Sequence, residues 1–195
     1  MALPLRRVRQ SEENLTPAQF EAMTEFDQGY ELLDGRLVKK PMAGDEHGRI
    51  IRSIMKYYDR FDPAETIGTL WAADVTFDVG TGWMPLPDLG FILASRVPPR
   101  SPKSVKGVPD WVVEVQSPSD LASKTEREAA AAKIQRWLSV GVRLLWSVNP
   151  DARQVEVYRP GPNQAKVVKV LVVGEVLDGE EVVPGFSIPV TALFG

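Results

Sequence analysis

The sequence predicts an α/β protein whose core is a mixed β-sheet flanked by helices. Strand-like apolar runs occur both before and after one long helical pattern at residues 123–140. The runs are short, and glycine, proline or asparagine follows most of them. The segment that joins the runs on either side of the long helix has the length of a βαβ unit, which makes those two strands parallel. We therefore expect about six strands in one sheet, with helices packed against it.

The first half of the chain contains signals for two helices and a hairpin. Thr16 and Gln19 have the spacing of a capping box and begin a short helix. An Asp-Gly pair between two apolar runs predicts a hairpin over residues 30–38. Apolar residues then recur at helical spacing over residues 45–61, which predicts the second helix.

Strands dominate the rest of the chain. The predicted strands are residues 70–79, 87–93, 111–116, 142–148 and 154–158, and shorter β segments follow between residues 166 and 193. Four prolines within residues 96–109 predict a surface loop that does not pack as sheet. Gly141 ends the long helix, as glycine commonly does at a helix C-terminus.

Composition limits the classes of protein and of metal site. The 195 residues are enough for one buried core, and no Ser/Gly-rich linker divides them, so we expect a single domain over residues 1–195. No apolar run approaches the roughly 20 residues of a membrane helix, and no hydrophobic segment follows the basic N-terminus, so we expect a cytoplasmic protein without a membrane partner. Because the chain has no cysteine and a single histidine, His47, any metal must be held mainly by carboxylates.

Two carboxylates interrupt strand-like apolar runs. Asp88 lies in the run of residues 86–92, and Glu114 follows 26 residues later in the run that begins at Asp110. A carboxylate that faces the interior of a sheet takes up a proton unless a cation or hydrogen-bond donors keep it charged. Two such acids on adjacent strand ends form an oxygen-rich site that suits Mg²⁺ or Mn²⁺, the ions of metal-assisted phosphodiester hydrolysis.

Side-chain alternation places Glu114 on the same face of its strand as Val112 and Gln116. We expect the opposite, apolar face to be core. Glu114 is then a buried acid that needs a partner, or an acid at the open end of the strand. The alternative is an edge strand whose outer face is solvated.

The net charge of −3 argues weakly against nucleic acid as a partner, because affinity for phosphates comes from concentrated positive charge. The positions of the basic residues along the chain matter more than this total. The candidate nucleic-acid-binding residues flank the two acid motifs and are His47, Arg96, Arg100, Lys103 and Lys124. The alternative for these residues is an ordinary solvated surface. The positions of most tryptophans favour core packing, and Trp83, in a loop beside Asp88, is the exception for which stacking on bases is worth testing.

Several motifs occur together in one order along the chain. They are Tyr30-Glu31-Leu32-Leu33-Asp34-Gly35, His47-Gly48-Arg49-Ile50, Pro87-Asp88, Val113-Glu114-Val115-Gln116-Ser117-Pro118-Ser119-Asp120, Lys133, Gly141-Val142 and Pro184-Gly185-Phe186-Ser187. This order resembles the Uma-two family of predicted endonucleases over nearly the whole chain, and that family resembles the PD-(D/E)xK restriction-endonuclease fold. The resemblance implies that Asp88 and Glu114 bind the metal and that Glu31 supports them.

One position departs from the broader restriction-endonuclease pattern. That pattern has a lysine two residues after the second acid, where this chain has Gln116, whose amide carries no charge. The resemblance implies that Lys133, on the following helix, supplies the cation. A lysine on the flank of that helix has a stem long enough to reach the end of the sheet, although an ordinary solvated lysine is the alternative. The expected catalytic residues are therefore Asp88, Glu114 and Lys133, with Gln116 orienting water.

Two functions follow from these observations. The first is a Mg²⁺- or Mn²⁺-dependent nuclease that hydrolyses the phosphodiester bonds of DNA. The second is a non-catalytic nucleic-acid or protein interaction module that keeps the nuclease fold, which the low net basicity and Gln116 favour. A nuclease that cuts both strands commonly pairs two sites by two-fold symmetry, so we also expect a homodimer.

Overall fold

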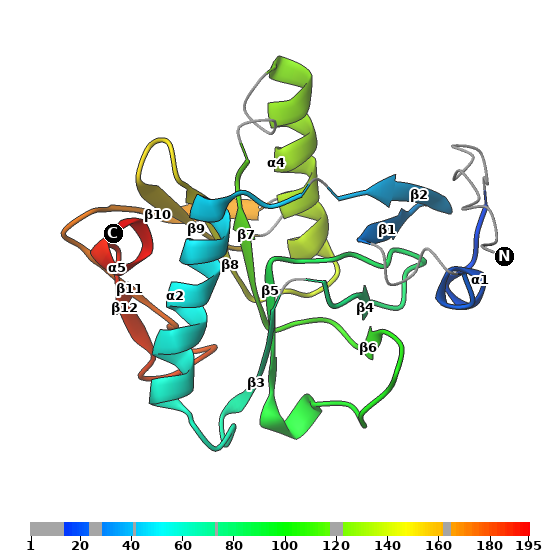
Figure 1. The fold of residues 1–195 in the computed structure, drawn as a ribbon, viewed down its shortest axis with the longest axis horizontal. Helices are drawn as coiled ribbons and strands as arrows, with labels where there is room; N and C mark the ends of the chain where they lie inside the picture. The colour runs from blue at the N-terminus through cyan, green and yellow to red at the C-terminus, as the bar shows by residue number, and fades with distance from the viewer. Residues whose placement is uncertain (1–13, 24–28, 41, 73, 118–122, 162–164) are drawn as a thin grey trace, which may run out of the picture.

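A six-stranded sheet forms the centre of the molecule, with the strand order β10-β9-β8-β7-β5-β3 (Figure 1). The computed structural model describes residues 14–23, 29–40, 42–72, 74–117, 123–161 and 165–195, so Pro118, Ser119, Asp120 and the basic N-terminus lie outside the described residues. The strands are β3 (Gly68–Ala72), β5 (Leu89–Leu93), β7 (Trp111–Val115), β8 (Leu144–Asn149), β9 (Gln154–Pro160) and β10 (Ala165–Val172).

The connection from β7 to β8 is the βαβ unit that the sequence predicts. Helix α4 (Lys124–Ser139) joins these strands, which pair in parallel with Trp111 opposite Leu144. The Ser123 hydroxyl accepts a hydrogen bond from the backbone N–H of Glu126 at 3.2 Å and so caps the start of the helix. The other neighbouring strands of this sheet pair antiparallel. The predicted α/β class with a mixed sheet is therefore confirmed.

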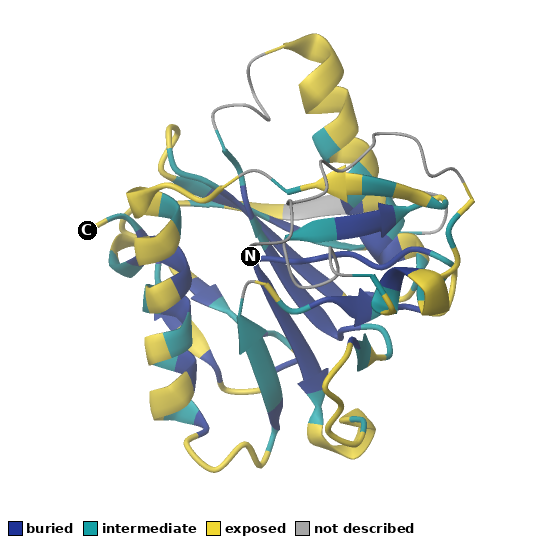
Figure 2. Ribbon diagram, turned by 45° about the vertical axis from the view of Figure 1, so that its right-hand side comes forward, coloured by how far each residue is buried: buried dark blue, intermediate teal, exposed yellow. Residues whose placement is uncertain are grey.

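Helices cover both faces of the sheet, and the central strands are buried between them (Figure 2). On one face, α2 (Asp45–Phe61) packs Tyr58 into a cluster that contains Trp111 of β7. On the other face, α4 packs Trp137 into a second cluster that contains Val112 of β7. Alternate side chains of β7 therefore enter two different cores.

Short elements surround this framework. They are α1 (Pro17–Glu21), β1 (Tyr30–Leu33), β2 (Arg36–Lys39), β4 (Phe77–Asp78), the 3-10 helix η1 (Ala94–Arg96), β6 (Val105–Lys106), β11 (Val176–Asp178), β12 (Ser187–Pro189) and α5 (Thr191–Phe194). Strands β1 and β2 form the predicted hairpin. Within the described ranges, no helix has both the length and the apolar character that crossing a membrane requires.

Two predicted segments differ from the structure. The strand expected at residues 70–79 is two strands, because Asp74 adopts a left-handed conformation with φ of 71° that ends the extended run. β3 lies in the central sheet, whereas β4 pairs in parallel with β6. Because β6 pairs with β4, the proline-rich segment of residues 96–109 contains one short strand, although the sequence predicts only a loop there.

Candidate active site

Strand register brings Asp88 and Glu114 to one end of the sheet. Strands β5 and β7 are antiparallel with Leu89 opposite Val113, so Asp88, just before β5, lies beside Glu114 near the end of β7. The backbone N–H of Val115 donates to Asp88 Oδ2 at 2.7 Å, which ties the two strand ends together. The spacing between neighbouring strands, about 4.8 Å, therefore sets how closely the two acids approach.

Glu114 points into the core on the α4 side of the sheet. The indole N–H of Trp137 donates to Glu114 Oε1 at 2.8 Å. β7 lies between β5 and β8, and both of its faces are covered, so the alternative of an edge strand with a solvated face is wrong. Burial raises the pKa of Glu114, with the charge of Asp88 acting in the same direction and that of Lys133 opposing it.

Lys133 joins two of the three acids. Its Nζ lies 3.1 Å from Glu114 Oε1 and 3.2 Å from Glu31 Oε1, so β1, β7 and α4 each contribute one residue to this contact. The backbone N–H of Leu86 also donates to Glu31 Oε1 at 3.2 Å. Burial acts to lower the pKa of Lys133, but the charges of Glu114, Glu31 and Asp88 outweigh it and raise that pKa above its ordinary value.

Asp88 is the most buried of the three acids, with 2% of its side chain exposed. Lys40 Nζ lies 2.6 Å from Asp88 Oδ1, and His47 Nε2 lies 3.1 Å from the same oxygen. Burial alone would raise the pKa of Asp88, but the hydrogen bond to His47 and the charge of Lys40 hold it well below its ordinary value. Asp88 is therefore kept as a carboxylate by two basic side chains and by the amide of Val115.

Sequence reasoning missed Lys40. The residue follows β2 directly and forms a Lys-Lys pair with Lys39, a pattern typical of a solvated hairpin end. The structure separates the two lysines, because Lys39 Nζ lies 4.4 Å from the centre of the Tyr30 ring while Lys40 enters the acid cluster. No local signal distinguishes them, since the contact of Lys40 with Asp88 spans 48 residues of sequence.

The side-chain amide of Gln116 has a hydrogen-bond partner for its nitrogen but none for its oxygen. Its Nε2 donates to Ser147 Oγ at 2.9 Å, which fixes the amide against β8. Its Oε1 is buried and has no hydrogen-bond partner. A buried carbonyl oxygen without a donor is uncommon and identifies a place where a water or a cation improves the site.

The donor set matches the chemistry of Mg²⁺ or Mn²⁺. The oxygen ligands at this end of the sheet are the carboxylates of Glu31, Asp88 and Glu114, and the amide oxygen of Gln116, which has no hydrogen-bond donor, lies two residues after Glu114 in the sequence. In the part of the chain that the structure describes, no three His, Asp or Glu side chains are arranged to hold a metal ion. The ammonium groups of Lys40 and Lys133 instead contact all three carboxylates.

The predicted nucleic-acid-binding residues fall into different environments. Arg96 bonds the buried Asp110, beyond the far end of β5 from Asp88. Two lysines are in ion pairs: Lys103 with Glu21 at 3.9 Å and Lys124 with Glu128 at 3.7 Å. Arg100 is exposed, and His47 lies in the acid cluster.

Trp83 does not offer a surface for base stacking. Only 1% of the residue is exposed, and its ring centre lies 4.6 Å from that of Trp137. The guanidinium of Arg136 lies over the same ring at 4.9 Å. Trp83 is therefore part of the core on the α4 side, like the tryptophans whose positions favour core packing.

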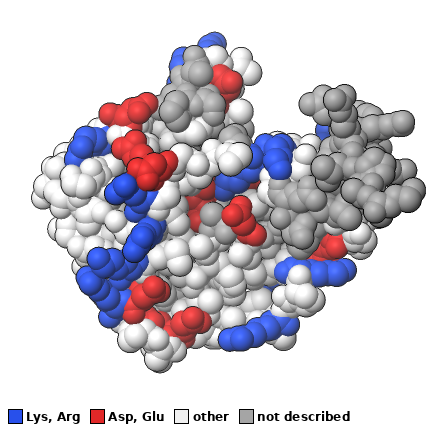
Figure 3. Space-filling model, in the orientation of Figure 1, with Lys and Arg blue, Asp and Glu red and all other residues white. Residues whose placement is uncertain are grey.

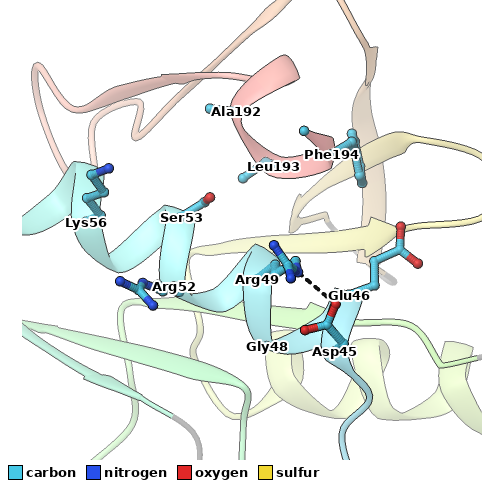
Figure 4. Close-up of a pocket in the computed structure, with 11 residues that line it drawn as sticks. Asp45, Glu46, Gly48, Arg49, Arg52, Ser53, Lys56, Ala192, Leu193 and Phe194 are labelled. Carbon is cyan, nitrogen blue, oxygen red and sulfur yellow. Dashed lines mark hydrogen bonds and ion pairs between the residues drawn. The ribbon is translucent and has the colours of Figure 1, made fainter.

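A separate groove lies between α2 and α5 (Figure 4). Its volume is about 770 Å³, and the α2 residues that line it include Arg49, Arg52, Ser53 and Lys56. At about 100° per residue, the three basic residues fall within about 60° of one another on the helix face opposite Tyr58. Lys and Arg side chains consequently form a run along α2 (Figure 3).

The comparisons with known proteins identify the family and the fold of the chain. The family model of Uma2, described as "Putative restriction endonuclease", matches residues 17–191. No curated protein matches the chain. A solved structure from Anabaena variabilis, described as a putative nuclease belonging to DUF820, is similar with a TM-score of 0.73 and 20% identity, over 92% of this chain and 97% of that chain. At that identity the likeness establishes the shared fold, while the family match confirms the predicted resemblance: the chain belongs to the Uma2 family of the restriction-endonuclease-like class.

Proposed function

We propose that this protein is a Mg²⁺- or Mn²⁺-dependent nuclease that hydrolyses phosphodiester bonds of DNA. The observation that carries the proposal is the meeting of Asp88, Glu114, Glu31 and Lys133 at one end of the sheet. Three carboxylates in one partly buried cluster repel each other and need positive charge. A divalent ion supplies that charge, and when bound it provides the Lewis acid for phosphodiester hydrolysis.

Each residue of the cluster has a distinct task in this proposal. Asp88 and Glu114 would hold the ion, with Glu31 as a supporting acid, and the free Oε1 of Gln116 would orient water. The ammonium of Lys133, held by Glu31 and Glu114, would stabilise the negative charge that develops on the phosphate oxygens. Its raised pKa keeps it protonated for that task at neutral pH.

The run of basic residues on α2 supports contacts with the DNA backbone outside the acid cluster. His47 contacts Asp88 from the same face of α2 as Tyr58, and the basic residues lie on the opposite face of that helix. Arg52 and Lys56 have no ion pair with any described residue, whereas Arg49 bonds Asp45 at 2.7 Å. Unpaired cations next to a groove attract phosphates more strongly than cations that are already neutralised.

A second candidate function is a nucleic-acid or protein interaction module without catalysis. The observation that favours it is that each of the three acids contacts a lysine, which supplies positive charge to the cluster without a metal ion. The uncharged Gln116 in the usual place of a lysine points in the same direction.

A cleavage assay separates the two functions. The purified protein is incubated with supercoiled plasmid, linear duplex and RNA in Mg²⁺, in Mn²⁺ and in a chelator. We expect metal-dependent cleavage of DNA that disappears in the Asp88→Asn variant, because the amide keeps the shape of Asp88 and removes its charge. Equal cleavage by both proteins would indicate a contaminant, and no cleavage by either would favour the interaction module.

Self-association stays a prediction. A nuclease that cuts both strands of a duplex needs two sites, and a dimer with two-fold symmetry supplies them. Light scattering at the concentration of the cleavage assay tests it, and a monomer that makes double-strand breaks would contradict it.

A further inference from the structure

Lys40 is held in the acid cluster by two acceptors. Its Nζ lies 2.6 Å from Asp88 Oδ1 and donates to the backbone oxygen of Leu86 at 2.9 Å. The backbone N–H of Lys40 donates to the carbonyl oxygen of Gly29 at 2.9 Å, so the main chain is anchored beside the hairpin. The side chain is 19% exposed, which leaves the ammonium close to solvent.

The contacts of Asp88 leave little room for another cation. Oδ1 already faces Lys40 and His47, which together use both of its lone pairs. Oδ2 accepts from the amide of Val115 and faces the main chain of β7. With 2% of the side chain exposed, Asp88 cannot turn an unused oxygen to solvent. A metal ion can therefore take Oδ1 only if one of the two basic side chains leaves.

Of these two, Lys40 is the one that can leave easily. Its four-carbon stem rotates about several single bonds while the anchored main chain stays in place, whereas the shorter His47 side chain starts from the backbone of helix α2 and has fewer bonds to rotate about. Lys133, by contrast, bridges two acids that belong to different elements, and its departure would leave both without a cation. The carbonyl of Leu86, the other acceptor of Lys40, is also an oxygen ligand of the kind that hard cations accept.

We propose that Lys40 is a resident cation of the site, whose ammonium holds the place of a divalent ion on Asp88 and must be displaced before the ion binds. Lys40 then sets the metal affinity of the site: it keeps the metal-free cluster stable and weakens binding of the ion by competition. This inference rests on the proposed function, because it concerns the same metal site. It differs from the role of Lys133, which stays beside the acids when the ion is bound.

Mn²⁺ binding to the purified protein tests this proposal without any measurement of activity. Isothermal titration compares the wild type with Lys40→Met, which keeps the length of the stem and removes the charge. The matched control is Lys39→Met, which removes the same charge from the neighbouring residue that lies over Tyr30. The conservative variant is Lys40→Arg, which keeps a cation at the position.

We expect Lys40→Met to bind Mn²⁺ roughly tenfold more tightly or better, because a unit charge a few ångströms from the ligands is removed. Lys39→Met and Lys40→Arg should bind as the wild type does. A Lys40→Met variant that binds no more tightly than the wild type, or a Lys39→Met variant that gains as much, would overturn the proposal. If Lys40→Met does not fold, as judged by circular dichroism, Lys40→Gln replaces it with the same expected result.

The outcomes also separate this proposal from the proposed function. If the wild type binds Mn²⁺ and cleaves DNA while Lys40→Met binds with unchanged affinity, the competition by Lys40 is refuted and the nuclease stands. If neither the wild type nor Lys40→Met binds Mn²⁺, both the metal site and the competition are refuted.

Discussion

The two ends of the β5–β7 strand pair each contain a buried aspartate that follows a proline, Asp88 at one end and Asp110 at the other. Asp110 is 1% exposed, bonds Arg96, accepts from the backbone N–H of Leu93 at 3.0 Å and lies 3.9 Å from Arg143. It has no second acid among its described contacts.

At the other end, three carboxylates share two lysines, and the amide oxygen of Gln116 is left without a donor. The charge and the hydrogen-bonding capacity of Asp110 are satisfied by two arginines and a backbone amide, so this aspartate anchors the strand ends. A cluster with more acids than resident cations can accept a further cation, so it can do chemistry. The same Pro-Asp dipeptide thus serves structure at one end and, in our proposal, catalysis at the other.

The largest difference between the two ends should appear in activity. Asp88→Asn should lower the rate of metal-dependent DNA cleavage by about a thousandfold or more, because charge stabilisation at the reacting phosphate is lost. Asp110→Asn should leave the rate of the folded protein nearly unchanged, because Asp110 lies at the far end of the strand pair. Cleavage rates normalised to folded protein measure both. A comparable loss in the two variants would remove the distinction between the ends.

The role of Lys133 sharpens the description of the catalytic end. Lys133→Ala should lower cleavage by about a hundredfold or more, while Mn²⁺ affinity measured by titration stays the same or rises. Gln116→Ala should have a smaller effect, and adding Gln116→Lys to Lys133→Ala should restore part of the rate. Lys169→Ala, which removes a lysine paired with Asp178 far from the acid cluster in the sequence, is the control. Normal cleavage by Lys133→Ala would show that the helix does not supply the cation.

The effects on stability should have the opposite order from the effects on activity, with the larger loss for Asp110→Asn. Asp110→Asn should lower the free energy of unfolding by about 2–4 kcal/mol, because it removes the negative charge opposite Arg96 and leaves one acceptor oxygen for two donors, Arg96 and the backbone N–H of Leu93. Asp88→Asn should cost less, about 1–2 kcal/mol, because Lys40 is free to move toward solvent. Urea unfolding without metal measures both values, and a larger cost for Asp88→Asn would contradict this ranking.

The cost of Asp88→Asn should also depend on pH. The pKa of Asp88 is lowered in the folded protein from its reference value of 3.8, so the carboxylate stabilises the fold at pH values above about 4. This stabilisation is lost as the pH falls from 3.8 through the lowered folded pKa. The stabilisation that Asp88→Asn removes should therefore be present at neutral pH and shrink as the pH falls below 3.8. A difference between the wild type and the variant that grows in acid would contradict the assignment.

The smallest expected effect concerns DNA binding outside the acid cluster. Arg52→Gln with Lys56→Gln should weaken binding to a duplex about tenfold and lower the slope of log affinity against log salt by about two, roughly 0.9 per lost phosphate contact. The comparison is Arg100→Gln with Lys103→Gln, which removes two positive charges from the loop that the sequence analysis predicts to bind nucleic acid. Fluorescence anisotropy in the absence of metal compares the two pairs. If the loop variant loses more DNA affinity than the α2 variant, the loop and not α2 is the main DNA contact.

Sequence reasoning succeeded where the information is local. The helix of residues 45–61 has the predicted bounds, because its apolar residues keep helical spacing throughout. The β7–α4–β8 unit was predictable because a strong strand, a capped helix and a second strand follow one another.

Features that depend on tertiary contacts were not predictable from the sequence. The break at Asp74 depends on a backbone conformation that no residue pattern there signals. Lys40 and Lys39 have the same local environment in sequence, and only the docking of the hairpin on the sheet separates them. The pairing of Arg96 with Asp110 likewise depends on the chain returning through residues 96–109, so Arg96 looked like a free surface cation.

The hydrogen bond from Trp137 to Glu114 gives the protein an optical reporter of its own site. The indole N–H of Trp137 bonds Glu114 Oε1 at 2.8 Å, and its ring lies 4.6 Å from that of Trp83. Indole emission responds to the charge and hydrogen bonding of the N–H group, so a change in the partners of Glu114 should shift or quench the fluorescence of this pair. Occupation of the cluster can thus be followed in the unlabelled protein as a change in its total tryptophan emission, to which Trp71, Trp111 and Trp146 also contribute.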